Sequence, residues 1–156
     1  MMFVEHNTGK AKAAMNFYTS IFKNSSIKGV LEYAKEKEEK PGYVKHAQFQ
    51  LNDFMLSCME SSVAHQFNFT EAVSLVVLTQ DQEETDYLWN SLIAEGGKES
   101  KCGWLKDQYG VSWQIIPKKL LELKDQENQE KAQKVVQAML KMEKIDISKL
   151  EKANQS

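Results

Sequence analysis

The stretch CGWLKDQYGVSWQIIP, residues 102–117, decides the fold, because it contains two strands and the turn that joins them. Within it, DQYG has Asp at the first and Gly at the last position of a four-residue turn. Side chains alternate between the two faces of a strand, so Trp113 and Ile115 share one face. That apolar face suits packing against a helix. Gln114 is therefore predicted to face the opposite side of the sheet.

The residues before this stretch predict the rest of a β-α-β-β-β module. The apolar run AVSLVVL, residues 72–78, is typical of a buried strand. Asp81 and Glu84 form a capping box at the start of a helix, which is expected to end at Gly96. A further strand is predicted at 99–106, before the strand that carries Gln114.

A module of the same order precedes this one. A short strand is predicted at 2–6 and a helix after Gly9, where apolar residues recur at three- and four-residue spacing. Further strands are predicted at 26–35, 43–51 and 54–59. The modules share this order but negligible sequence identity, so the repeat is one of pattern only.

Strict alternation in YVKHAQFQL predicts which side chains of the third strand face the core. Ala47, Phe49 and Leu51 are expected on one face. The opposite face is expected to carry Val44, His46, Gln48 and Gln50.

The expected fold class is α+β, with two βαβββ modules at 1–62 and 63–117 in one structural domain. Residues 118–156 are expected to form a C-terminal helical extension, in which Ser148 and Glu151 form a second capping box. The extension has an apolar stripe that must pack on something. The stripe contains Ala132, Val135, Val136, Met139, Leu140 and Met142.

Composition excludes several classes of function. The net charge is −2 and all 20 basic residues are Lys, so nucleic-acid recognition by Arg is not expected. No apolar run approaches the ~20 residues of a membrane span, and the N-terminus lacks the apolar core of a signal peptide. A cytoplasmic protein is expected. Cys58 and Cys102 show no metal-binding spacing and are interpreted as buried, reduced and unreactive thiols.

Several stretches resemble the PhnB-like branch of the vicinal-oxygen-chelate (glyoxalase/bleomycin-resistance) superfamily: GKAKAAMNFYTSIFKNSSI, KHAQFQLNDFMLS, FNFTEAVSLVV, CGWLKDQYGVSWQIIP and KAQKVVQAMLKMEKIDISKLEKA. Members of this branch often carry the description 3-demethylubiquinone-9 3-methyltransferase. The resemblance implies that each module curls its sheet into a half-barrel, with helices on one face and a cavity on the other. Compared with that branch the chain starts several residues late, so a short first strand is expected.

In the superfamily's metal enzymes, the first and last strands of each module supply one ligand each to a divalent ion. Here the corresponding strands offer only His6 and, just past its strand, Glu60. The resemblance places Gln114 where those enzymes have a carboxylate, and a neutral amide is a much weaker ligand. The sequence therefore predicts no metal and no other cofactor.

Six residues are candidates for lining a ligand cavity: His46, Gln48, Ser57, Phe67, Trp104 and Gln114. Gln114 is interpreted either as a group that orients a ligand or as a cavity group satisfied by water. His46 is either an acid/base group or part of a polar outer face. The aromatic residues, with Phe69, either close over a ligand or plug the half-barrel.

Three functions remain open. The first is a metal-free protein that binds a small organic molecule. The second is a superfamily enzyme with a displaced metal or none. The third is the methyltransferase of the family description, although the chain lacks the GxGxxG turn of common S-adenosylmethionine enzymes. A homodimer is expected, because half-barrels leave strand edges uncovered. The tail stripe is expected either to contact the partner chain or to fold back on its own domain.

Overall fold

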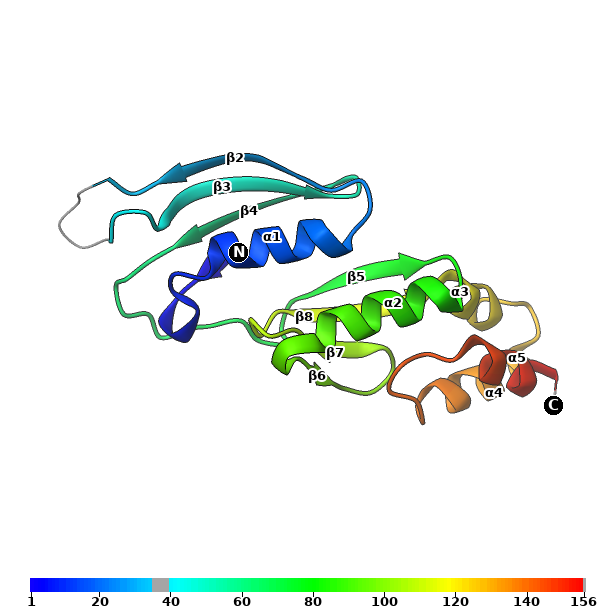
Figure 1. The fold of residues 1–156 in the computed structure, drawn as a ribbon. Coiled ribbons are helices and arrows are strands. Elements are labelled where there is room, and N and C mark those ends of the chain that lie inside the picture. Colours follow the sequence, from blue (N-terminus) through cyan, green and yellow to red (C-terminus); the bar gives the residue numbers. More distant parts are fainter. Residues whose placement is uncertain (35–39, 156) are drawn as a thin grey trace. The chain divides into compact units, whose positions relative to one another are not determined.

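The computed structural model describes residues 1–34 and 40–155, and its contacts divide the chain into two compact units, Met1–Asn68 and Phe69–Ser156 (Figure 1). Each unit has a four-stranded mixed sheet with a helix packed on it. Three further helices follow the last strand of the second unit. The predicted α+β class, with two βαβββ modules and a helical extension, is confirmed. Among the described residues, no helix is both long and apolar enough to cross a membrane.

The first unit has strand order β1-β4-β3-β2, with β1 parallel to β4 and the other pairs antiparallel. Its elements are β1 (Met2–Phe3), η1 (Glu5–Asn7), α1 (Ala11–Ile21), β2 (Ser26–Glu32), β3 (Val44–Leu51) and β4 (Phe54–Glu60). Helix α1 buries Met15 and Tyr18, and the Tyr18 ring stacks on Phe49 of β3 with 6.2 Å between centroids. Because Phe49 faces this helix, the predicted inward face of β3 is confirmed.

The first strand is shorter than the predicted span of 2–6. It ends at Phe3, and a 3-10 helix follows in which Glu5 has a φ of 51°. A left-handed residue cannot continue a strand. His6 therefore lies in η1 rather than at the end of a strand.

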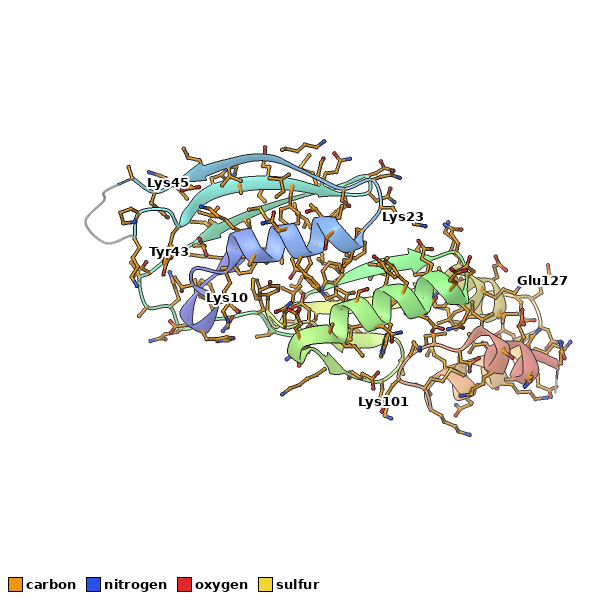
Figure 2. The ribbon with its side chains drawn as sticks, viewed as in Figure 1. Lys10, Lys23, Tyr43, Lys45, Lys101 and Glu127 are labelled. Carbon is orange, nitrogen blue, oxygen red and sulfur yellow. The ribbon has the colours of Figure 1, made fainter. Side chains whose placement is uncertain are left out.

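The turn before α1 needs glycine. Gly9 has a φ of +87°, and a Cβ at this position would lie 3.3 Å from the Tyr43 hydroxyl oxygen. Figure 2 shows Tyr43 and Lys10 at the same end of the first unit. Any side chain at position 9 would be strained and would crowd the Tyr43 ring.

The prediction for Val44 is wrong. Val44 is fully buried, whereas His46 is exposed on the opposite face. Val44 pairs with Glu32 and His46 pairs with Leu31, so Lys45 is an extra residue in the ladder. Such a bulge reverses the side-chain phase, which simple alternation cannot anticipate.

The second unit has strand order β5-β8-β7-β6, with β5 parallel to β8. Its elements are β5 (Ser74–Thr79), α2 (Gln82–Ile93), η2 (Ala94–Gly96), β6 (Lys98–Glu99), β7 (Trp104–Lys106) and β8 (Ser112–Pro117). The predicted cap is present, since the Glu84 N–H donates to Asp81 Oδ1 at 2.8 Å. The Glu84 carboxylate in turn accepts from the Gln80 N–H at 2.7 Å.

The predicted strand at 99–106 is divided into β6 and β7. Between them Cys102 has a φ of 60° and Gly103 a φ of 82°. A Cβ at Gly103 would lie 2.9 Å from the Ile115 carbonyl oxygen, so only glycine fits there. The two left-handed residues turn the chain and end the strand.

A buried carboxylate fixes the turn between β7 and β8. Asp107 accepts hydrogen bonds from the N–H groups of Tyr109 at 2.9 Å and Val111 at 3.0 Å. Its second oxygen accepts from the Trp113 indole at 2.8 Å. These bonds hold Trp113 on the buried side of β8 and so place Gln114 on the other side.

The extension packs on its own unit. It consists of α3 (Lys118–Lys124), α4 (Gln129–Met139) and α5 (Ile147–Gln155), and its loop pairs with the β6–β7 turn, where Gly103 N–H donates to the Glu143 carbonyl at 2.7 Å. The apolar cluster that joins it to β8 contains Ile116, Leu120, Leu123, Val135, Met142, Ile145 and Leu150. Of the predicted stripe, Ala132, Val135 and Met142 are buried, whereas Leu140 is 50% exposed. The stripe thus folds back on its own chain, and contact with a partner stays a prediction.

Candidate functional site

The face of the first sheet opposite α1 carries three of the candidate residues. Gln48 pairs with Ser57 of β4, and His46 pairs with Leu31 of β2. All four side chains are exposed. Large apolar groups border them, and Leu31 is 59% exposed and Met55 48% exposed. The predicted candidates His46, Gln48 and Ser57 therefore share one face of the first unit.

The equivalent face of the second sheet carries Gln114. Trp113 and Ile115 are buried, 2% and 0% exposed, whereas Gln114 is half-buried. The face predicted for Gln114 agrees with this arrangement. In register with it, Val76 of β5 and Trp104 of β7 lie on either side.

Ser74 is the partner of Gln114 that sequence reasoning missed. Gln114 Nε2 donates to Ser74 Oγ at 2.8 Å, and Oε1 accepts no hydrogen bond from the described residues. The alternation of Ser74, Val76 and Leu78 in β5 is a signal for their common face. Their pairing with β8 depends on the parallel register, which that alternation does not fix.

A second polar group lies beside this pair. Ser112 aligns with Ser74 on one side and Lys106 on the other, and is 1% exposed. Its Oγ has no hydrogen-bond partner among the described residues. Because an unsatisfied buried hydroxyl is costly, such a group is typical of a place where water or a ligand binds.

Both candidate metal ligands have other roles. Glu60 is the last residue of β4, not just past it, and is 2% exposed. Its carboxylate accepts from the N–H groups of Ala11 at 3.0 Å and Val44 at 2.6 Å, so it joins α1, β3 and β4. His6 lies in η1, where its Nδ1 is 3.0 Å from Asn68 Nδ2.

The described strands carry no carboxylate on the faces opposite α1 and α2. Glu71, which precedes β5, forms an ion pair with Lys106. No group of three His, Cys, Asp or Glu residues able to hold a metal ion occurs within 1–34 and 40–155. A superfamily-type metal centre does not fit these residues. The metal content of the purified protein stays a prediction.

The remaining candidates are aromatic. Phe67, in the first unit, is 52% exposed and contacts the His65 ring with 4.9 Å between centroids. Trp104 is half-buried in the second unit. The first unit therefore holds four of the six predicted residues and the second unit holds two. Their meeting in one cavity stays a prediction.

The two thiols differ. Cys58 is buried, as expected, and burial raises its pKa to about 11. Cys102 is only half-buried and lies in the turn before β7, so its predicted burial at the start of a strand is wrong.

Comparisons with known proteins find several similar structures. The solved structure of the PhnB protein from Bacillus cereus is 38% identical, with a TM-score of 0.67, over 75% of this chain and 96% of that chain. A protein from Pseudomonas aeruginosa shares the fold at 19% identity and a TM-score of 0.62, over 74% and 93% of the two chains. A glyoxalase/bleomycin resistance protein from Albidiferax ferrireducens matches at 14% identity and a TM-score of 0.46, over 74% and 93%. No curated protein matches.

A family model described as 3-demethylubiquinone-9 3-methyltransferase matches residues 1–116. The match ends within β8, so the resemblance noted for the tail lies outside it. Every candidate cavity residue, and both modules except Pro117, lie inside it. The chain therefore belongs to the PhnB-like family that carries this description.

Proposed function

We propose that the protein binds a small organic molecule without a metal ion, on the face of the second sheet opposite α2. The observation that carries this proposal is the polar group around Gln114. Ser74 holds one end of the Gln114 amide, so its carbonyl oxygen remains for a ligand. The buried Ser112 hydroxyl lies on the same face. Two neutral groups of this kind orient a ligand but do not chelate a metal.

The surroundings of Gln114 suggest the class of ligand. Trp104 and Val76 border it, and Val76 is 56% exposed. A flat or apolar body can pack on these side chains, while a hydroxyl group donates a hydrogen bond to the Gln114 carbonyl oxygen. The ring of a demethylubiquinone, which the family description names, has this chemistry.

Catalysis has less support than binding. His46, the candidate acid/base group, makes no hydrogen bond to the described residues, so nothing there orients its ring. General acid or base catalysis needs a positioned group. Methyl transfer would need a site for S-adenosylmethionine, and the sequence lacks the usual glycine-rich turn.

The test uses 2,3-dimethoxyphenol, a soluble ring with oxygen substituents, and isothermal titration calorimetry. We expect binding to the purified protein, and a loss of about 1 kcal/mol, or about fivefold in Kd, in Gln114→Ala. Gln137→Ala, an exposed change in α4, serves as the matched control and should bind like the wild type. Unchanged binding in Gln114→Ala would place the ligand elsewhere.

Two further measurements separate the alternatives. Elemental analysis of the purified protein should find no stoichiometric divalent ion, and one ion per chain would support a metal enzyme. Titration with S-adenosylmethionine should give no heat of binding. Saturable binding of that cofactor would instead support the methyltransferase function.

A further inference from the structure

A row of four polar residues crosses the second sheet on the face opposite α2. Residues that pair directly across strands point to the same face of a sheet. The adjacent row fixes the face, because Leu105 is buried and its partner Glu99 accepts a hydrogen bond at 2.8 Å from the indole of Trp89 in α2. The polar row therefore points away from α2, and it consists of Lys98, Lys106, Ser112 and Ser74.

Two positive charges meet in this row. Lys98 and Lys106 face each other across β6 and β7, and facing like charges repel, so that an anion near them is favoured. Glu71 supplies one carboxylate, which pairs with Lys106. The hydrogen bond from Lys106 lowers the pKa of Glu71 below its usual value, so the carboxylate is ionised at neutral pH.

The ion pair spans β8 at Ser112. Lys106 lies on β7 and Glu71 precedes β5, while β8 lies between these two strands (Figure 1). The Glu71 carboxylate makes no hydrogen bond to the Ser112 hydroxyl, whose oxygen has no partner among the described residues. The Glu71 side chain is 64% exposed, and an ion pair at such exposure is weak. An anion from solution that binds Lys106 and also accepts a hydrogen bond from Ser112 can therefore displace Glu71.

On the basis of the proposed function, we propose that the ligand is a planar organic anion, whose charge site Glu71 occupies until the ligand binds. The row of Lys106 and Ser112 lies two residues from the row of Trp104 and Gln114, which is about 7 Å along the strands. A benzene ring with a carboxylate at one end and a hydroxyl at the other fits this spacing. Its carboxylate binds Lys106 and Ser112. Its ring packs beside Trp104, where its hydroxyl donates to the Gln114 carbonyl oxygen.

Two probes of nearly equal shape and different charge test the class of ligand. The probes are 3-hydroxybenzoate and 3-hydroxybenzamide, titrated calorimetrically into the full chain at low salt. We expect the acid to bind about tenfold more tightly, because a hydrogen bond to a charged group is stronger than one between neutral groups. Lys106→Gln should remove this preference. Lys131→Gln, an exposed change in α4, should retain it.

Glu71→Gln tests the role of the internal carboxylate. The change should tighten the binding of 3-hydroxybenzoate by about threefold, because no ion pair has to open, and leave that of 3-hydroxybenzamide unchanged. Misfolding cannot produce a gain in affinity. Glu122→Gln is the matched control, since Glu122 pairs with Lys119 at 3.0 Å and its side chain is 63% exposed. It should change neither affinity.

The outcomes separate the ligand class from the proposed function. Equal affinities of the wild type for the two probes would overturn the anionic class but leave binding of a small molecule in place. So would a preference for the acid that Lys106→Gln retains, since the anion would then bind elsewhere. An unchanged affinity of Glu71→Gln for the acid would overturn the role of Glu71. If neither probe binds and 2,3-dimethoxyphenol does not bind either, the proposed function itself is wrong.

Discussion

Cys58 shows how burial controls the chemistry of a single residue. With a pKa of about 11, the Cys58 thiol at pH 8 is ionised in about one molecule in a thousand. We expect iodoacetamide at pH 8 to label the native protein once, at the half-buried Cys102. Labelling of Cys58 should rise as the pH approaches 11, since deprotonation then becomes favourable.

Intact mass spectrometry of the wild type and C102S measures this difference. The C102S protein should stay unlabelled at pH 8 without denaturant. Two labels on the native wild type would contradict the assignment. Cys102→Ser is a suitable change because Cys102 lies in a turn and makes its hydrogen bond through the backbone N–H, to the Met142 carbonyl at 2.9 Å.

Sequence patterns predict which face of a strand a side chain occupies better than they predict its hydrogen-bond partner. Alternation placed Gln114 opposite Trp113, because a strand has a fixed period of two. It did not identify Ser74, whose bond to Gln114 joins positions 40 residues apart. Nor did it place Glu60, because capping by a distant carboxylate leaves no local signal.

At the scale of elements, Glu60 holds α1 and β3 to β4 through two buried hydrogen bonds. Glu60→Ala leaves both N–H groups without a partner, and we expect the free energy of unfolding to fall by about 3 kcal/mol. Urea denaturation followed by circular dichroism gives this value. Glu83→Ala, an exposed change in the first turn of α2, should cost less than about 1 kcal/mol. A similar small loss in Glu60→Ala would show that water replaces the carboxylate.

The order of the elements was predictable, but their irregularities were not. Both βαβββ modules follow from apolar periodicity and capping residues. The bulge at Lys45 and the divided strand around Gly103 depend on contacts with other strands. Bulges and turns of this kind are set by tertiary packing, so sequence period alone predicts one continuous strand.

For the whole molecule, the tail is expected to contribute to the stability of the second unit. Ile145 is fully buried in the cluster with Ile116, and Ile145→Ala should lower the free energy of unfolding by about 3 kcal/mol. Leu140→Ala removes an exposed side chain from the same tail and should change it by less than about 0.5 kcal/mol. Equal effects of the two changes in thermal and urea unfolding would mean that the tail is not docked.

Gln82 adds a specific polar contact to this docking. Its Nε2 donates to the Ile145 carbonyl at 3.1 Å, and its Oε1 accepts from the Ile147 N–H at 2.8 Å. The sequence predicted helices in the tail but left open what they pack on. The packing of the tail depends on hydrogen bonds between residues that are 63 and 65 positions apart in the sequence, and no local pattern relates such residues.

The return of the tail to the β6–β7 turn has a consequence for synthesis on the ribosome. Domains generally fold as units while the chain is made, beginning at the N-terminus. The first unit finds all its strand partners within residues 1–68, so it can fold early. The second unit cannot cover Ile116 until Ile145 and Leu150 have been translated. During that interval the apolar side chains around Ile116 are exposed to solvent on the nascent chain. We expect the chain to depend on chaperones at this stage.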